Sequence, residues 1–210
     1  MKKLLSAFQS DQLDLNNRIV MAPLTRSRAT GNLPNDMMAK YYALRASAGL
    51  IITEGTAPSP NGLGYPNIPG IFSQQQIDGW KKVTDAVHAN EGKIFIQLMH
   101  TGRVAHELNL PEGAEVIGPS AIAAGGEMFT PEGLKPHGMP REMSLGDIAQ
   151  TQAEFIQSAK TESKVKRANR RVRWRQRKQG SIRAGSGGAD RARHRPGENR
   201  DSFVPVRRVQ

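Results

Sequence analysis

Short apolar runs alternate with stretches of helical spacing over the first 160 residues of the chain. The expected strands cover residues 18–22, 50–53 and 93–99, and the expected helices cover 34–48, 73–87 and 144–159. Because strands separated by helices pair in parallel through right-handed crossovers, this order predicts an α/β fold. The strands are apolar throughout rather than alternately polar, which favours a sheet buried on both faces.

Two of the expected helices carry local signals. Ser73 and Gln76 have the spacing of a capping box, in which each side chain accepts a hydrogen bond from the main-chain N–H of the other residue. The helix over 34–48 is expected to stop at Gly49 and to carry one stripe of residues at helical spacing. The residues of this stripe are Met37, Met38, Tyr41, Leu44, Arg45 and Ala48.

Residues 103–143 form a long Gly/Pro-rich segment between the third strand and the third helix. In α/β domains a loop of this length is usually functional, as a lid or a wall over a site. We therefore expect a functional wall here, with an ordinary surface insertion as the alternative.

The basic charge of the chain sits in its last fifty residues. Residues 1–160 carry 14 basic and 15 acidic side chains, whereas residues 161–210 carry 16 basic and 4 acidic ones. The second segment also lacks sustained apolar periodicity, and a segment of this composition cannot offset the entropy of ordering itself. The sequence thus predicts an α/β domain over 1–160 and an unstructured, arginine-rich tail over 161–210.

Polar or small residues follow each of the three expected strands. The three groups are Pro23-Leu24-Thr25-Arg26, Glu54-Gly55-Thr56 and residues 97–103. The carboxyl ends of parallel strands meet at one edge of the sheet, where catalytic and cofactor-binding residues lie in this architecture. Taken singly, Thr25 and Gln97 also suit a structural role at a strand end, but three such groups in succession predict a site.

These segments resemble the first three barrel strands of the old yellow enzymes, which include N-ethylmaleimide reductases and 12-oxophytodienoate reductases. The matching stretches read RIVMAPLTR at 18–26, LIITEG at 50–55 and QLMHTGR at 97–103. Gly64-Tyr65-Pro66 and Pro69-Gly70 also fit the pattern. The resemblance covers residues 1–160 and implies the N-terminal portion, about three βα units, of a TIM (β/α)8 barrel.

The resemblance implies a non-covalent FMN cofactor and a set of residues that hold it. The Pro23, Leu24 and Thr25 loop would hold FMN, with the Thr25 hydroxyl bonded to O4 of the isoalloxazine ring and tuning the flavin. Gly55 would allow close approach of the backbone to the ring. The Gln97 amide would bond the pyrimidine end of the flavin.

The implied reaction is NAD(P)H-dependent reduction of small electron-poor alkenes, such as enones, maleimides or nitro compounds. Tyr65 and Met99 would line the substrate pocket. Met99 stands where relatives often have Trp, so a different pocket shape is expected there.

The family's substrate-binding His pair and proton-donating Tyr lie in a segment that resembles His-Ser-Ala-His-Gly-Tyr, and the sequence contains no such segment. The strands that bind the FMN phosphate are also missing from the pattern. We therefore interpret the change after Lys160 as a frameshift or deletion, and expect negligible turnover by this chain. The alternatives are a basic arm over 165–178 that binds nucleic acid or an acidic surface, and a half-barrel completed by a partner.

Other classes of site find no support in the sequence. The chain has no cysteine, which excludes disulfides, zinc–thiolate sites and cysteine nucleophiles. His100 and His106 lack a third metal ligand at useful spacing, so no metal is expected. His100 is expected to be a buried hydrogen-bonding residue, with a catalytic base as the alternative. No dinucleotide fingerprint, P-loop or membrane-spanning run occurs, and polar residues 9–12 interrupt the start of the chain before a signal-like run develops. A cytoplasmic protein is the expectation.

Overall fold

Three parallel strands in chain order form the central sheet. The structure is a computed structural model that describes residues 3–10 and 13–166. The sheet has the order β3 (Val20–Met21), β4 (Leu50–Thr56) and β5 (Ile94–Leu98). Each strand overlaps one of the three expected from the sequence, although β3 is shorter than expected and β4 continues three residues further. Most of the expected tail, residues 167–210, lies outside the described residues, so the expectations for it are not addressed by the structure.

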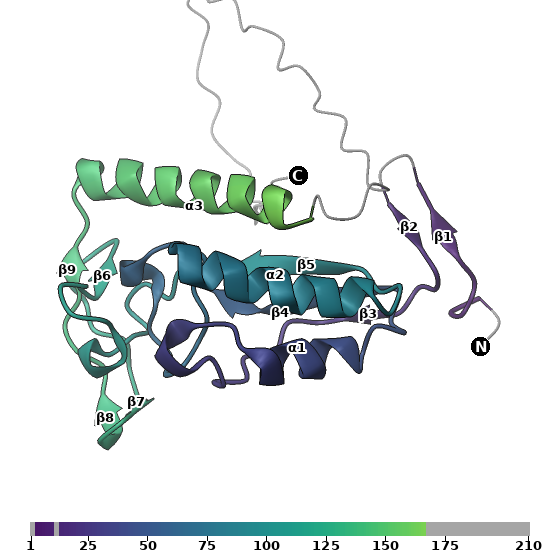
Figure 1. Cartoon of the computed structure of the whole chain (residues 1–210). Coiled ribbons are helices and arrows are strands. Elements are labelled where there is room, and N and C mark those ends of the chain that lie inside the picture. Colours follow the sequence, from purple (N-terminus) through teal and green to yellow (C-terminus); the bar gives the residue numbers. More distant parts are fainter. Residues whose placement is uncertain (1–2, 11–12, 167–210) are drawn as a thin grey trace, which may run out of the picture. The chain divides into compact units, whose positions relative to one another are not determined.

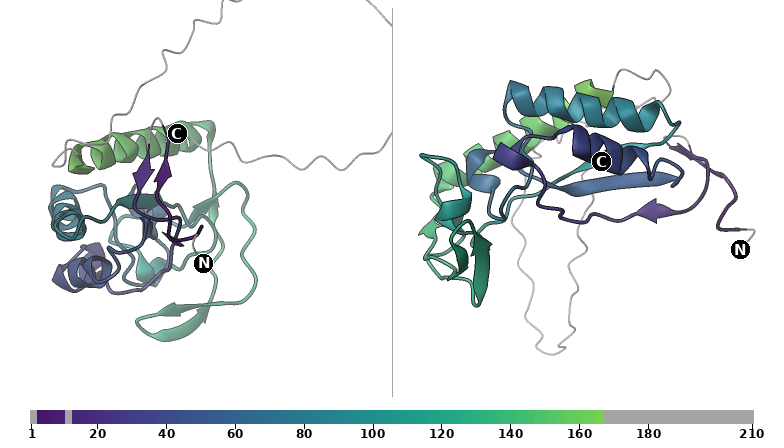
Figure 2. Two further views of the ribbon diagram at one scale, coloured as in Figure 1. Left: turned by 90° about the vertical axis from the view of Figure 1, so that its right-hand side faces the viewer. Right: turned by 60° about the horizontal axis from the view of Figure 1, so that its bottom comes forward.

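Helices connect and cover the strands. They are α1 (Asp36–Ala43), α2 (Gln74–His88) and α3 (Leu145–Lys166). Seen along the strands, the three helices follow one another in chain order around the outside of the sheet (Figures 1 and 2). Both crossovers join neighbouring parallel strands through a helix, as the α/β prediction requires.

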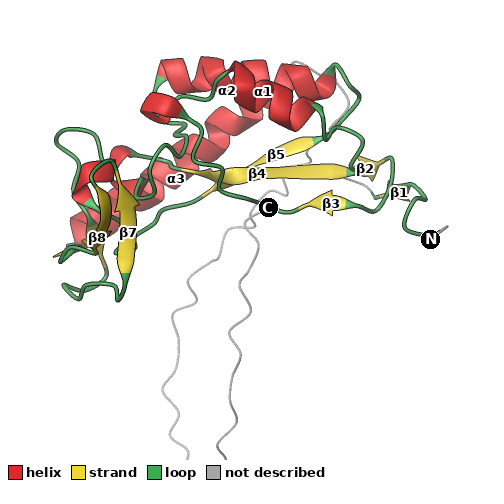
Figure 3. Cartoon of the chain, turned by 90° about the horizontal axis from the view of Figure 1, so that it is seen from below, coloured by secondary structure: helices red, strands yellow, loops and turns green. Residues whose placement is uncertain are grey.

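The main core lies between the sheet and the pair α1 and α2 (Figure 3). Trp80 on α2 is fully buried there, and its indole N–H donates to the carbonyl of Gly70 at 3.0 Å. The other buried members of this core are Ala29, Met38, Tyr42, Ala46, Ile51, Ile71, Val83, Val87, Ile94 and Ile96. Burying apolar surface of this kind contributes about 25 cal/mol per Å² to folding.

The capping box predicted for α2 is confirmed. The Ser73 hydroxyl accepts the N–H of Gln76 at 3.2 Å, and the Gln76 side chain accepts the N–H of Ser73 at 3.1 Å. The prediction for α1 is wrong in part, because the helix ends at Ala43 rather than at residue 48. The buried face of α1 carries Met38 and Tyr42, whereas Met37 and Leu44 are 64% and 72% exposed.

Helix α3 continues past the boundary that the sequence placed at residue 160. It extends to Lys166, and Thr161 and Glu162 still pack on the rest of the fold. The Glu162 carboxylate accepts the N–H of Ile96 on β5 at 3.1 Å. Within the described residues, α3 therefore runs six residues past residue 160, and the contacts of Thr161 and Glu162 stabilise this extension.

The segment 103–143 is built from short ordered pieces rather than being an irregular loop. Strands β7 (Glu127–Thr130) and β8 (Gly133–Pro136) form an antiparallel hairpin, and β6 (Ile117–Gly118) pairs in parallel with β9 (Arg141–Glu142). The remaining short elements are the pair β1 (Phe8–Gln9) and β2 (Asp14–Leu15), and the 3-10 turns at Thr30–Asn32, Pro60–Gly62 and Glu107–Asn109. No described helix combines the length and the apolar character needed to cross a bilayer.

Candidate functional site

The carboxyl ends of β3, β4 and β5 meet at one edge of the sheet, the edge next to segment 103–143 (Figure 1). Gly55 on β4 lies directly opposite Gln97 on β5 in the strand register. The loop that follows β3 reaches the same place, since the N–H of Arg26 donates to the Glu54 carboxylate at 3.2 Å. The structure thus brings together the three groups that the sequence predicted to share a site.

The end of β4 departs from regular pairing. The register shifts between Ile52 and Gly55, and two threonine side chains satisfy the groups that this shift leaves unpaired. The Thr53 hydroxyl accepts the N–H of Gln97 at 3.1 Å and donates to the carbonyl of Glu54 at 2.9 Å. The Thr56 hydroxyl donates to the same carbonyl at 3.1 Å. This irregularity sets Gly55, rather than its neighbours, opposite Gln97.

The polar side chains at these strand ends are available to a ligand. Among the described residues, neither the Thr25 hydroxyl nor the Gln97 side-chain amide has a hydrogen-bond partner. Thr25 is exposed, Leu24 is 55% exposed, and Pro23 and Gln97 are half-buried. Such groups, fixed by the backbone but unpaired, can donate to and accept from the edge of a planar heterocycle.

Gly55 faces the side chain of Met99. A Cβ atom placed on Gly55 would lie 2.4 Å from Met99 Cε and 2.6 Å from its sulfur, so the site has no room for a larger residue while Met99 keeps this rotamer. Met99 is held by its own N–H, which donates to the carbonyl of Thr56 at 2.9 Å. The flexible thioether is the movable part of this contact.

Tyr65 lies with Met99 against a second, smaller apolar cluster. The buried members of this cluster are Ala57, Leu63 and Ile68, and Phe72 and Leu110 also pack against it. The two predicted pocket residues therefore pack against the same cluster although they are far apart in the chain.

Glu54 and Tyr42 are part of this site, and the sequence reasoning assigned neither of them a role. The Glu54 carboxyl is 1% exposed, and its second oxygen accepts the hydroxyl of Tyr42 on α1 at 3.2 Å. Burial raises the pKa of Glu54, while the bonds from Arg26 and Tyr42 act in the opposite direction. Burial and the neighbouring Glu54 likewise raise the pKa of Tyr42. The sequence does hold one signal for Glu54: it is a carboxylate that directly follows an apolar strand and precedes a glycine.

His100 is a half-buried histidine with one satisfied nitrogen. Its Nδ1 accepts the N–H of Gly102 at 3.0 Å, which places the ring proton of the neutral form on Nε2. Burial lowers the pKa of His100, against a smaller opposite effect of Glu154. No group of three metal-ligating side chains occurs within residues 3–10 and 13–166.

A family model agrees with this arrangement. The model, described as the NADH:flavin oxidoreductase / NADH oxidase family, matches residues 3–166. The chain belongs to this family. The match ends at the same residue as α3. It confirms the resemblance to the old yellow enzymes that was inferred from the three strand motifs.

Relatives share both sequence and fold with this part of the chain. Rice (Oryza sativa subsp. japonica) 12-oxophytodienoate reductase 7 is 42% identical over 160 residues, which cover 74% of this chain and 41% of the rice protein. The structure of morphinone reductase is 41% identical with a TM-score of 0.72, covering 78% of this chain and 45% of that one. The structure of the old yellow enzyme homologue of Zymomonas mobilis is 41% identical with a TM-score of 0.73, and the match covers 78% of this chain and 46% of that one.

The chain therefore spans less than half the length of these relatives. Its parallel βα units correspond to part of their barrel, which confirms the fold predicted from the sequence. The residues present also fit one part of an FMN site: an unpaired hydroxyl on Thr25 and an unpaired amide on Gln97 lie at the same sheet edge as Gly55, whose side-chain position is filled by the flexible thioether of Met99.

Proposed function

We propose that the ends of β3, β4 and β5 hold the isoalloxazine ring of FMN in an enzyme that reduces activated alkenes. The observation that carries the proposal is the juxtaposition of Gly55 and Gln97 across the β4–β5 ladder, with the Thr25 loop tied to the same strand end through Glu54. Two unpaired polar side chains beside a glycine match the donor and acceptor pattern along a flavin edge.

Each residue has a distinct task in this proposal. The Thr25 hydroxyl donates to O4 of the ring and stabilises the negative charge that reduction places there. The Gln97 amide both donates to and accepts from the pyrimidine edge. Tyr65 and Met99 would line the substrate pocket beside the bound ring. When bound, FMN supplies hydride transfer between NAD(P)H and the electron-poor alkene.

Part of the catalytic apparatus of the family is missing from the sequence. The segment with the His pair and the proton-donating Tyr does not occur in it, and His194, the only histidine after His137, stands in an arginine-rich context. We therefore expect the 210-residue polypeptide by itself to reduce alkenes no faster than free FMN. A clear excess over free FMN would contradict this part of the proposal.

Flavin binding tests the proposal directly. Added FMN should lose fluorescence and shift its visible spectrum on mixing with the purified chain. Thr25→Val should weaken binding by about five- to tenfold, equivalent to about 1 kcal/mol for one hydrogen bond, and Gln97→Leu, which removes a donor and an acceptor, should weaken it by at least as much. Thr30→Val, at an exposed threonine a few residues away, is the matched control and should leave binding unchanged. Absence of any FMN binding, or equal binding by all variants, would refute the proposed site.

A further inference from the structure

Glu54 is a buried carboxylate that joins three elements. One oxygen accepts the N–H of Arg26 in the loop after β3 at 3.2 Å, and the other accepts the hydroxyl of Tyr42 on α1 at 3.2 Å. Tyr42 also accepts the N–H of Glu54 at 2.9 Å, so the tyrosine and the glutamate are bonded to each other twice. The β4 end, α1 and the loop are thus held by one side chain.

Two bonds tie the backbone of the loop to the rest of the fold: the Arg26 N–H donates to Glu54, and the side-chain amide of Asn35 donates to the carbonyl of Arg28 at 2.8 Å. Across residues 22–28, the N–H of Arg26 is the one main-chain amide that bonds to a described residue outside the loop. Ser27, the next residue, has φ of +51°, a left-handed conformation that a side chain other than glycine adopts at some cost in free energy. Such a conformation persists only where the surroundings hold it, and the bond to Glu54 is adjacent to it.

The surroundings of Glu54 show that packing alone does not account for a carboxylate here. Burying an ionisable group costs free energy unless it is bonded, and an apolar residue would fill the same volume without that cost. The Tyr41 ring, next to the Glu54 partner Tyr42, carries two charged neighbours: the Arg26 guanidinium lies 5.2 Å from the centre of that ring, and that of Arg45 lies 3.8 Å from it. The Tyr41 ring in turn meets Tyr42 edge to face.

We propose that Glu54 is a positioning residue of the flavin site, which fixes the Thr25 loop against the end of β4 through the Arg26 N–H. The proposal rests on the proposed function for the identity of the ligand. Its structural half, that Glu54 sets the loop, holds with or without flavin. Gly55 follows Glu54 directly, so Glu54 links the Thr25 loop to the Gly55 position, the two parts of the proposed flavin site.

The test compares Glu54→Leu, which removes the acceptor, with Glu54→Gln, which keeps an oxygen for the Arg26 N–H. Hydrogen exchange at the Arg26 amide, measured by NMR on the full chain without flavin, should speed up about tenfold in Glu54→Leu and stay within about threefold in Glu54→Gln. Tyr41→Phe is the matched control, since the Tyr41 hydroxyl has no hydrogen-bond partner among the described residues. Core amides of α2 serve as the reference for global stability.

Tyr42→Phe covers the case in which Glu54→Leu does not fold. It removes the second anchor of the carboxylate and should also speed exchange at Arg26, though by less. Unchanged Arg26 exchange in whichever of these variants folds would overturn the positioning role.

FMN titration separates this inference from the proposed function. If wild type binds FMN, Glu54→Leu should bind about tenfold more weakly and Glu54→Gln should bind like wild type; equal binding by all three would overturn the inference. If wild type binds no FMN, the proposed function fails, whereas the exchange data still decide whether Glu54 fixes the loop.

Discussion

Gly55 and Gly79 show how the same added methyl group meets two different neighbours. At Gly55 the closest neighbours of the new Cβ would belong to the mobile end of Met99, with Cε at 2.4 Å, while Met99 Cβ would lie at 3.2 Å. At Gly79, on α2, it would lie 2.4 Å from the carbonyl oxygen of Pro34, which is backbone and cannot rotate away. The first glycine therefore makes room for the Met99 side chain, and the second keeps two segments close together.

Gly55→Ala should change the unfolding free energy by less than about 1 kcal/mol, because Met99 can adopt another rotamer. It should still weaken FMN binding, since the methyl group and the displaced thioether enter the ring site. Gly79→Ala should lower the unfolding free energy by about 1–2 kcal/mol, which is the overpacking penalty less the gain in helix propensity. Urea denaturation of both variants measures this, and a larger loss for Gly55→Ala than for Gly79→Ala would contradict the packing argument.

The buried Glu54 carboxyl makes stability depend on pH with a definite sign. Its pKa in the folded protein is raised by burial, above the unfolded value of about 4.3. The group therefore binds its proton more tightly when folded, and this contribution is complete below about pH 4.3 and is lost as pH rises through the folded pKa. Glu54→Gln should be nearly neutral at pH 4 and increasingly stabilising toward pH 7 in urea denaturation. A difference that shrinks as pH rises would show that the carboxylate is favoured in the fold.

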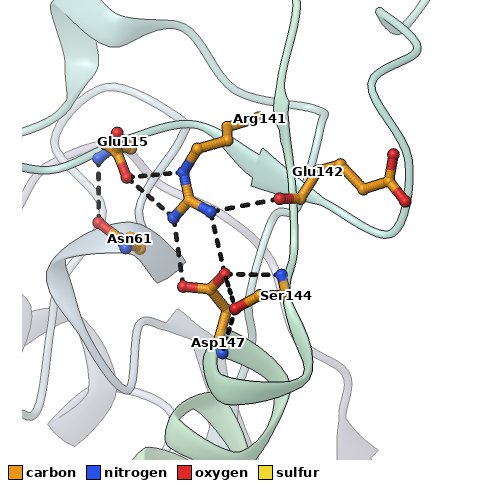
Figure 4. A network of polar contacts seen from close by, with 6 residues as sticks. All are labelled: Asn61, Glu115, Arg141, Glu142, Ser144 and Asp147. Atoms are coloured by element: carbon orange, nitrogen blue, oxygen red, sulfur yellow. Dashed lines mark hydrogen bonds and ion pairs between the residues drawn. The ribbon is translucent and has the colours of Figure 1, made fainter.

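At the scale of elements, one arginine joins the segment 103–143 to α3 (Figure 4). Arg141 on β9 contacts Glu115 at 2.9 Å and Asp147, in the first turn of α3, at 2.9 Å. Asp147 also accepts the N–H of Ser144 at 2.7 Å, while the Ser144 hydroxyl accepts the N–H of Asp147 at 3.1 Å. The helix start predicted at Ser144 is thus confirmed, and the same residues anchor the end of segment 103–143.

Asp147→Ala removes both the cap and the partner of Arg141. The pKa of Asp147 is held well below its usual range, chiefly by Arg141 and then by Ser144, so the carboxylate is ionised at neutral pH. Hydrogen exchange should speed up several-fold in the first turn of α3 and in the β6–β9 pair, and not in α2. Glu132→Ala, which breaks a hairpin ion pair with Lys135, is the control. Equal exchange in the two variants would show that Arg141 does not connect these elements.

Sequence patterns predicted the positions of helices and strands better than they predicted which side of a helix is buried. The strands and the cap of α2 were predictable because they depend on local spacing. The face of α1 was not, because α1 is apolar on more than one side: Met38 and Tyr42 face the core, whereas Leu44 lines an open pocket with Ile19 and Met21 beside β3. Periodicity alone cannot decide which of two apolar sides the rest of the chain covers.

At the scale of the molecule, the apolar strand sequences predict a sheet that is buried on both faces, whereas the helices of the structure cover one face. Ile94 and Ile96 of β5 lie in the core with the helices, whereas Ile52 is half-buried and Val20 is 48% exposed. The apolar strands were therefore a correct sign of a parallel sheet. Full burial depends on further strands of a closed barrel, which a pattern within each strand cannot reveal. The site follows the same logic: its strand-end residues were predictable, and the Glu54 contacts, which join distant elements, were not.

The edge of β5 that does not face β4 is where the sheet would otherwise recruit another strand. There the Ile96 N–H donates to Glu162, so a side chain of α3 takes the place of a neighbouring strand. Glu162→Ala should cost about 1 kcal/mol in urea denaturation and raise self-association, because an unpaired strand edge pairs with other chains. Glu162→Gln removes the same charge but keeps an acceptor oxygen, and should behave like wild type in light scattering. If both variants associate equally, the charge of α3, rather than the capped edge, is what keeps the chains apart.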